Sequence, residues 1–339
     1  MRELPNIQSR SYRSATFVAA LLLVAIGCSP AARPAPENGV VRVSLQPVPA
    51  YAPLWIAKRK GWLEATLKEA KLGDVEWSTL RDGPLQNEAL AAGLIDVALT
   101  ADTPAIIGRS AGLDVKIVSL AAVSPESLAI LLPADSPIRS VSDLESKKVA
   151  ATKGSFCHHL LALALQREGL SLSSVRFINM SGPEINTSLQ TGQIDAGATW
   201  EPYISQVVSN GSAKILLDGA NLKSGNEVIL VTSDLIEHSP ETVTKILEVF
   251  RRGRDFLREH PEEAAQLIAE DVNLEPEQLV ATFPKIEYIP PLSDATLAEL
   301  DATQKFLLDL GVNRQSVDIS EFVDLQFDRA AFVNSESGT

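Results

Sequence analysis

A twenty-residue stretch of this chain occurs twice, and the repeat restricts the folds that the chain can adopt. The copies are GPLQNEALAAGLIDVALTAD at 83–102 and GPEINTSLQTGQIDAGATWE at 182–201, which align without a gap 99 residues apart and agree at eight of twenty positions. Average residue frequencies would give only about one or two identities. In each copy Pro starts a helix, Gly93 or Gly192 ends it, and Ile-Asp opens a buried strand. The chain therefore repeats one unit of turn, helix and strand.

Strand and helix patterns alternate around both copies. We predict strands at 40–46, 75–80, 95–100, 115–122, 147–152, 175–180, 214–217 and 228–233, with helices between them. Such a succession builds a largely parallel sheet with helices on both faces. After residue 233 the pattern becomes helical: Ser239-Pro240-Glu241 starts a helix, Pro261 and Pro276 each open another, and 293–310 forms one more.

The length of 339 residues suggests about two domains. Because each copy of the repeat lies in its own β/α succession, we predict two α/β lobes with a cleft between them. Residues 40–130 form the first part of lobe I, 131–231 form lobe II, and the helical segment 232–339 returns to lobe I. The apolar segments 128–133 and 228–233 are the predicted hinge strands.

The N-terminus indicates export. Arg2, Arg10 and Arg13 precede an apolar run at 16–26, which is typical of a secretory signal peptide covering residues 1–27. The sequence Ala25-Ile26-Gly27-Cys28 is similar to a bacterial lipoprotein cleavage box, and it predicts acylation of Cys28. Ordinary secretion with cleavage nearby is the alternative. Residues 28–39 are rich in Pro and Ala and are predicted to form a flexible tether.

Charge and cysteine content exclude other classes of protein. Apolar residues make up 45% of the chain and charged residues 22%, as in ordinary globular proteins. The net charge of -13, with no basic cluster, argues against nucleic acid as a partner. If Cys28 carries lipid, Cys157 has no partner, so no disulfide framework is expected.

Three segments resemble a known family. They are 83–106, 134–155 and 194–203, and they are similar to periplasmic substrate-binding proteins of ABC importers for aliphatic sulfonates, a grouping that includes binding proteins for taurine, nitrate, bicarbonate and thiamine pyrimidine precursors. The similarity extends over about residues 40 to 325. It implies the type II periplasmic binding fold, two α/β lobes joined by two hinge strands, with the C-terminal helices packing on the first lobe.

The resemblance also implies a function without catalysis. We expect a monomeric, lipid-anchored receptor, periplasmic or at the cell surface, that delivers a small anionic organic solute, an aliphatic sulfonate, to the membrane subunits of an ABC permease. No cofactor, metal or catalytic residue is predicted. Nitrate, bicarbonate or a thiamine pyrimidine precursor is the alternative ligand. An exported enzyme, since thiamine-pyrimidine synthases share the fold, and an interaction lipoprotein are alternative functions.

Ligand-binding residues are expected where strands end and helices begin, because helix N-termini present unpaired N–H groups to an anion. The candidates are Gln46, Tyr51, Gly83, Thr100, Ala101, Gly154, Ser155, Phe156, His158, Trp200 and Glu201. The family often has Thr-Gly-Asp where this chain has Thr100-Ala101-Asp102. Phe156 is also bulkier than the residue usual after the Gly154-Ser155 turn.

Several of these residues have a purely structural alternative. Ser155 and Asp102 are also suited to capping a helix, and Trp200 and Tyr203 to packing in the core. His158 and His159 are adjacent on a predicted helix and point about 100° apart, so they do not suit one metal ion. A lone Cys such as Cys157 is more often a buried apolar residue than a nucleophile.

Overall fold

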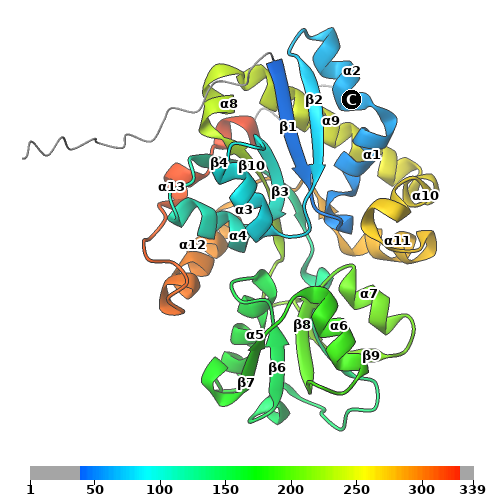
Figure 1. Ribbon diagram of the computed structural model, residues 1–339, viewed down its shortest axis with the longest axis vertical. Coiled ribbons are helices and arrows are strands. Elements are labelled where there is room, and N and C mark those ends of the chain that lie inside the picture. The colour runs from blue at the N-terminus through cyan, green and yellow to red at the C-terminus, as the bar shows by residue number, and fades with distance from the viewer. Residues whose placement is uncertain (1–38, 329–339) are drawn as a thin grey trace, which may run out of the picture. The chain divides into compact units, whose positions relative to one another are not determined.

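The computed structural model describes residues 39–328. The predicted signal peptide, Cys28 and the tether as far as residue 38 lie outside the described residues, as does the segment 329–339. Within 39–328, two separate sheets confirm the predicted α/β class (Figure 1).

The larger sheet has six strands in the order β11-β4-β10-β3-β1-β2. They are β1 (Val40–Leu45), β2 (Asp74–Thr79), β3 (Val97–Ala101), β4 (Val115–Val123), β10 (Asn226–Thr232) and β11 (Glu287–Tyr288). β1 pairs in parallel with β2 and β3, whereas β10 runs antiparallel between β3 and β4. The late strand β10 therefore returns into the middle of a sheet begun much earlier in the chain.

The smaller sheet has five strands in the order β7-β6-β8-β5-β9. They are β5 (Leu128–Pro133), β6 (Lys148–Ala151), β7 (Arg176–Asn179), β8 (Ala196–Trp200) and β9 (Ala213–Asp218). β5 runs antiparallel between β8 and β9, and β6 runs parallel to β7 and β8. This order repeats that of five strands in the larger sheet, with one antiparallel strand at the same place.

Helices cover both faces of each sheet, because successive strand residues point to opposite faces. In the smaller sheet, Leu128 and Ile130 pack with α5 (Phe156–Arg167), whereas Ala129 and Leu131 pack with α6 (Gly182–Gln190) and α7 (Tyr203–Val208). On the larger sheet, α1 (Ala52–Lys60), α2 (Trp62–Glu69), α9 (Pro240–Glu259) and α10 (Pro261–Val272) share one core. α4 (Asp102–Ser110), α12 (Asp294–Asp309) and α13 (Ile319–Phe322) share the other.

The C-terminal helices pack on the first lobe, as predicted. α8 (Ser233–His238) contacts β10, α9 lies against α1, α11 (Pro276–Thr282) contacts α10, and α12 contacts α4. One face of α9 is buried, as the helical spacing of its apolar residues requires: Val243, Ile246, Leu247, Phe250 and Leu257. The backbones of α9 and α1 approach so closely that a Cβ on Gly253 would lie 2.0 Å from the carbonyl oxygen of Pro53.

The two copies of the repeat fold into the same unit. α3 (Gly83–Ala91) and α6 occupy identical positions in the repeat, and so do β3 and β8. The aspartate of each Ile-Asp pair accepts a hydrogen bond from the neighbouring strand, Asp96 from Arg42 N at 2.9 Å and Asp195 from Lys148 N at 2.8 Å. These aspartates therefore join strands and do not belong to a binding site.

A second pair of equivalent contacts fixes how each repeated helix meets the next one. Asn87 Nδ2 donates to the carbonyl oxygen of Pro104 at 2.8 Å, and Asn186 Nδ2 to that of Tyr203 at 3.0 Å. At the start of each copy, a Cβ on the glycine would come within 2.4 Å of Pro104 or 2.3 Å of Tyr203. No side chain fits at these two glycines, because the start of each repeated helix contacts the residue at 104 or 203 directly.

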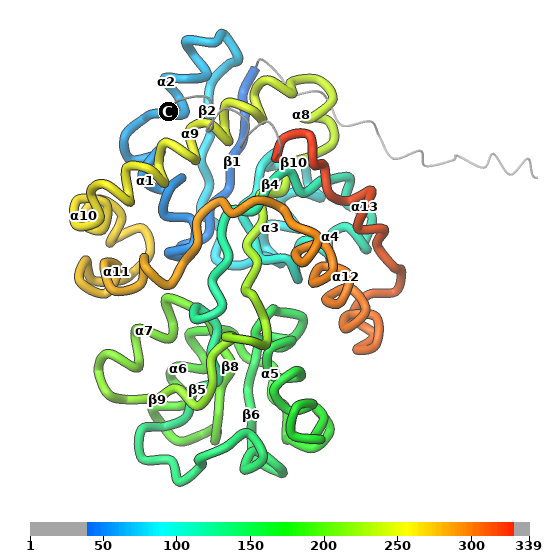
Figure 2. Tube along the Cα trace, turned by 180° about the vertical axis from the view of Figure 1, so that it is seen from behind, coloured from blue at the N-terminus to red at the C-terminus, as the bar shows by residue number. Residues whose placement is uncertain are grey.

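Two passages of the chain join the sheets, but the predicted hinge segments 128–133 and 228–233 lie almost wholly inside them. β5 and β10 are each hydrogen-bonded on both sides, so neither spans the gap. The connections are the shorter segments 124–127 and 219–225 (Figure 2). They lie side by side, because Ser124 N donates to the carbonyl oxygen of Ser224 at 3.1 Å.

Candidate functional site

A cavity lies where helix starts from both lobes meet. From the first lobe it is lined by Gln46, Val48, Asp82, Gly83, Pro84, Asn87, Ala101, Pro104, Ile107 and Glu227. From the second lobe it is lined by Thr152, Lys153, Gly154, Ser155, Phe156 and Trp200. Mostly apolar walls with a few polar groups are typical of small-molecule sites.

The turn before α5 is the clearest helix start on the cavity wall. Gly154 has φ +77°, and its N–H donates to His158 Nδ1 at 3.2 Å. Ser155 Oγ accepts a hydrogen bond from His158 N at 3.2 Å, so Ser155 is the helix cap. The first-turn N–H groups of Phe156 and Cys157 have no partner within the helix. The turn therefore presents backbone donors, and the ligand contact of Ser155 stays a prediction.

On the first-lobe side, Gln46 is held by a network below the start of α3. Its Nε2 donates to Gln86 Oε1 at 2.8 Å and to Thr100 Oγ1 at 3.3 Å. Thr100 is buried and is not among the lining residues, so it positions Gln46 instead. Asp82 caps α3 by accepting a hydrogen bond from Leu85 N at 3.1 Å.

Trp200 and Phe156 form an aromatic wall of the cavity. Their ring centroids are 5.9 Å apart, and Trp200 also meets Tyr203 edge to face at 5.5 Å. Trp200 therefore lines the cavity and packs in the core at once. Tyr203 packs behind it against the start of α6.

Glu227, at the start of β10, is a lining residue that the sequence patterns did not single out. The Tyr51 hydroxyl donates a hydrogen bond to its Oε2. Tyr51 is buried and not on the wall, so it acts through Glu227. Burial raises the pKa of Glu227 to about 8. The available signal was a single acidic residue opening an otherwise apolar strand, NEVILVT.

His158 and Glu201, two predicted ligand-binding residues, lie away from this cavity. His158 stacks on Phe177 with centroids 4.6 Å apart, and its Nδ1 already accepts the Gly154 N–H. Glu201 accepts hydrogen bonds from Ser205 N and Ser205 Oγ, at 3.0 and 2.9 Å. It faces a smaller neighbouring cavity of about 210 Å³. Both side chains are engaged with the protein.

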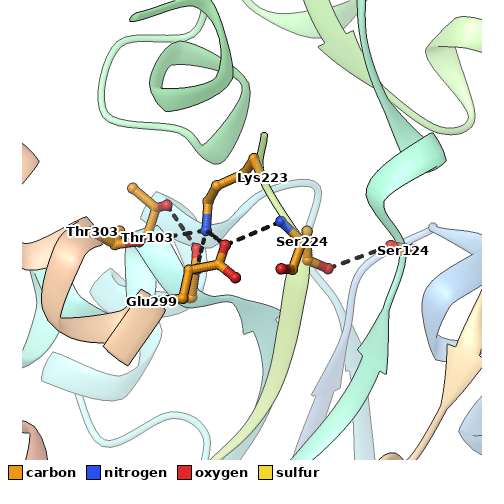
Figure 3. Close-up of polar contacts among 8 residues, drawn as sticks. Thr103, Ser124, Lys223, Ser224, Glu299 and Thr303 are labelled. Atoms are coloured by element: carbon orange, nitrogen blue, oxygen red, sulfur yellow. Dashed lines mark hydrogen bonds and ion pairs between the residues drawn. The ribbon is translucent and has the colours of Figure 1, made fainter. Parts of the chain in front are cut away.

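Asp102 is not the helix cap that we predict, because α4 begins at Asp102 itself and its N-cap is Ala101. Its carboxylate is fully buried and pairs with Lys223 Nζ at 2.5 Å. Lys223 Nζ also lies 2.7 Å from Glu299 Oε1, which in turn accepts a hydrogen bond from Ser224 N at 3.1 Å (Figure 3). This buried cluster fastens the connection 219–225 to the first lobe.

The charge of the wall comes from few side chains. Of the lining residues in the described part of the chain, Lys153 is the one basic residue, and Asp82 and Glu227 are the acidic ones. Asp82, Thr152 and Lys153 were missed as candidates although they directly precede the predicted turns. Nothing in the sequence distinguishes the remaining first-lobe lining residues from core residues: Val48, Pro84, Asn87, Pro104 and Ile107.

Residues 39–328 contain neither a candidate metal-binding cluster nor a candidate membrane-spanning helix. No cluster of three or more His, Cys, Asp or Glu side chains there is suited to hold a metal ion. None of the helices in that range has both the length and the apolar character needed to cross a membrane.

Comparisons with known proteins agree with this geometry. A family model described as NMT1/THI5 like matches residues 48–264. A putative aliphatic sulfonates-binding protein of Bacillus subtilis (strain 168) is 30% identical over 319 residues, which cover 94% of this chain and 95% of that protein.

Two solved structures share the fold. The periplasmic aliphatic sulphonate binding protein SsuA from Escherichia coli gives a TM-score of 0.75 at 26% identity and covers 85% of this chain and 92% of its own. The alkanesulfonate-binding protein SsuA from Xanthomonas axonopodis pv. citri, bound to MOPS, gives 0.77 at 26% identity, with 87% and 99% covered. The predicted periplasmic binding fold is therefore confirmed.

Proposed function

We propose, from the premise that this chain belongs to the NMT1/THI5-like family, that it is the solute-binding component of an ABC importer and takes an aliphatic sulfonate into its cavity. The observation that carries this proposal is the cavity itself, in which helix starts from both lobes surround an apolar space. The protein then acts as an exported monomer that hands its ligand to a permease.

The cavity suits an anion with an apolar tail. Unpaired N–H groups at a helix start bind tetrahedral oxyanions, and the turn at Gly154 presents such groups beside Lys153. Phe156 and Trp200 offer aromatic surface to the tail. Ligand contacts from both lobes would stabilise a closed form, the movement occurring at 124–127 and 219–225. We propose lobe boundaries within these two connections, and not at residues 130 and 231, because β5 pairs in the smaller sheet from Leu128 and β10 pairs in the larger sheet from Asn226.

We propose that the protein binds its ligand without catalysing a reaction, because the potentially reactive side chains of the second lobe are buried away from the cavity. Cys157 is fully buried, and burial raises the pKa of its thiol well above the ordinary value. His158 is buried as well, and neither residue is on the cavity wall. A catalytic nucleophile or base must contact the ligand, and neither Cys157 nor His158 is placed to do so.

A titration with candidate ligands tests the proposal. Ethanesulfonate, taurine, MOPS, nitrate, bicarbonate and a pyrimidine are compared by calorimetry and by thermal shift, since a ligand at 100 times its Kd adds about 2.7 kcal/mol of stability. We expect sulfonates to bind, and Trp200→Ala to weaken them at least about tenfold. Trp62→Ala is the matched control, because Trp62 packs on Phe256 outside the cavity. If only nitrate or only a pyrimidine binds, the proposed sulfonate ligand is wrong. If none of these compounds binds, the proposed receptor function is wrong.

The lipid anchor is a separate proposal that rests on the sequence Ala25-Ile26-Gly27-Cys28. Mass spectrometry of the N-terminal peptide of the mature protein would show diacylated Cys28. Cys28→Ser should leave the protein soluble after cell fractionation. An unmodified N-terminus elsewhere would indicate ordinary secretion.

A further inference from the structure

Glu227 combines burial with a position on the cavity wall. It is 6% exposed and lines both the main cavity and the smaller one beside it. On β10 it is paired with Ala101 of β3 and Ala122 of β4, and Ala101 is itself a lining residue. A carboxyl group is thus held at one end of the central strand β10, beside the cavity where the ligand is proposed to bind.

The two oxygen atoms of this carboxyl group have different surroundings. Tyr51 donates its hydroxyl hydrogen to Oε2, and burial raises the pKa of Tyr51 well above its ordinary value, so Tyr51 stays a donor. Oε1 receives no hydrogen bond from residues 39–328. When the group is neutral, its proton therefore belongs on Oε1, because Oε2 already accepts. Oε1 is the atom left to meet a ligand.

Groups close to Glu227 shift its pKa in opposite directions. Asp102 raises the pKa of Glu227, whereas Lys223 and the Tyr51 hydrogen bond lower it. Cys157 is a neutral thiol close enough to be affected by Glu227. Burial is the largest cause, and it holds the pKa at about 8, so the carboxyl group is mostly neutral at pH 7.

We propose that Glu227 determines specificity by presenting a carboxylic acid O–H, through Oε1, to an oxygen atom of the anionic ligand. A neutral acid adds a hydrogen-bond donor without adding charge, and buried carboxylic acids are known to act in this way. The ionised form would repel the same ligand. This inference rests on the proposed function, since it requires an anion in the cavity.

The test measures Kd for ethanesulfonate from about pH 6 to pH 9, a range in which a sulfonate keeps its charge. If only the neutral acid binds, the apparent Kd rises about tenfold over this range, in proportion to the lost neutral fraction. Near pH 8, calorimetry in two buffers should detect uptake of about half a proton per ligand. Glu227→Gln keeps a neutral donor, so it should bind with little dependence on pH and without proton uptake.

Tyr51→Phe is a second variant with nearly the same shape. It removes a hydrogen bond that lowers the pKa of Glu227, so the loss of affinity should move to higher pH. A Kd that is constant with pH in the wild type, or one that still rises in Glu227→Gln, would overturn the inference. So would taurine binding that tightens with pH and is lost in Glu227→Gln, because Glu227 would then act as a carboxylate. If no anion binds the wild type at any pH, the proposed function itself fails.

Discussion

His159 should make the protein less stable in acid, and replacing it with Phe should reduce that loss of stability. The ring is 4% exposed and stacks on Phe306 with centroids 4.0 Å apart. Its Nδ1 is buried without a hydrogen-bond partner. Burial, with a smaller effect from Lys223, lowers the pKa of His159 to about 3. His159→Phe keeps an aromatic ring of similar size and removes the unpaired nitrogen.

The magnitude follows from the difference in pKa between the folded and unfolded chain. An unfolded His has a pKa near 6.5, so below that pH the unfolded chain binds a proton that the folded chain does not. Stability is therefore fully present above about pH 6.5 and is lost as the pH falls towards the folded pKa. Between about pH 7.5 and pH 5 the loss is about 2 kcal/mol for His159 and about the same for His158, whose pKa is lowered to about 4.

Urea unfolding at these two pH values measures the effect. His159→Phe should reduce the acid-induced loss by about 2 kcal/mol and leave the protein at least as stable at pH 7.5. His158→Phe is the matched control: it should reduce the acid loss similarly but cost about 1 kcal/mol at pH 7.5, because the Gly154 N–H loses its acceptor. If the free energy of unfolding of His159→Phe still falls by the full wild-type amount between the two pH values, the inference that His159 is buried in its neutral form is wrong.

Two substitutions and one labelling experiment test other parts of the structure. Lys223→Met should lower the free energy of unfolding by roughly 3–5 kcal/mol, because two carboxylates lose their cation; no change in urea unfolding would contradict the buried cluster. Gly83→Ala should destabilise the protein by about 1–3 kcal/mol, since its Cβ would lie 2.4 Å from Pro104, and thermal unfolding measures this. Cys157 should not react with a thiol reagent until urea unfolds the chain, and rapid reaction of the native protein would show that the thiol is accessible.

Element boundaries followed closely from local signals. The helices predicted to start at Pro240 and Pro261 are observed at Pro240–Glu259 and Pro261–Val272, and the helix predicted at 293–310 is observed at Asp294–Asp309. The repeat was equally informative, because its helix and strand start and end at equivalent residues in both copies. Pro, Gly and apolar spacing act within one or two turns of chain, so they can be recognised without tertiary structure.

The cavity was only partly predictable. Gln46, Gly83, Ala101, Gly154, Ser155, Phe156 and Trp200 line it as expected. The same rule also selected four residues that do not line this cavity, Tyr51, Thr100, His158 and Glu201, since a position after a strand does not specify the direction of a side chain. The direction of each side chain is set by the residues that it contacts in the folded protein.

The sequence by itself determined a duplicated β/α unit, a two-lobed α/β chain and the helix starts that face a common cleft, because those features depend on near neighbours along the chain. Only the tertiary structure decided the electrostatics of the site. Tyr51 and Glu227 are 176 residues apart, and Asp102 and Lys223 are 121 apart. Burial and pairing set the charge of such groups, and both arise only when distant segments pack together.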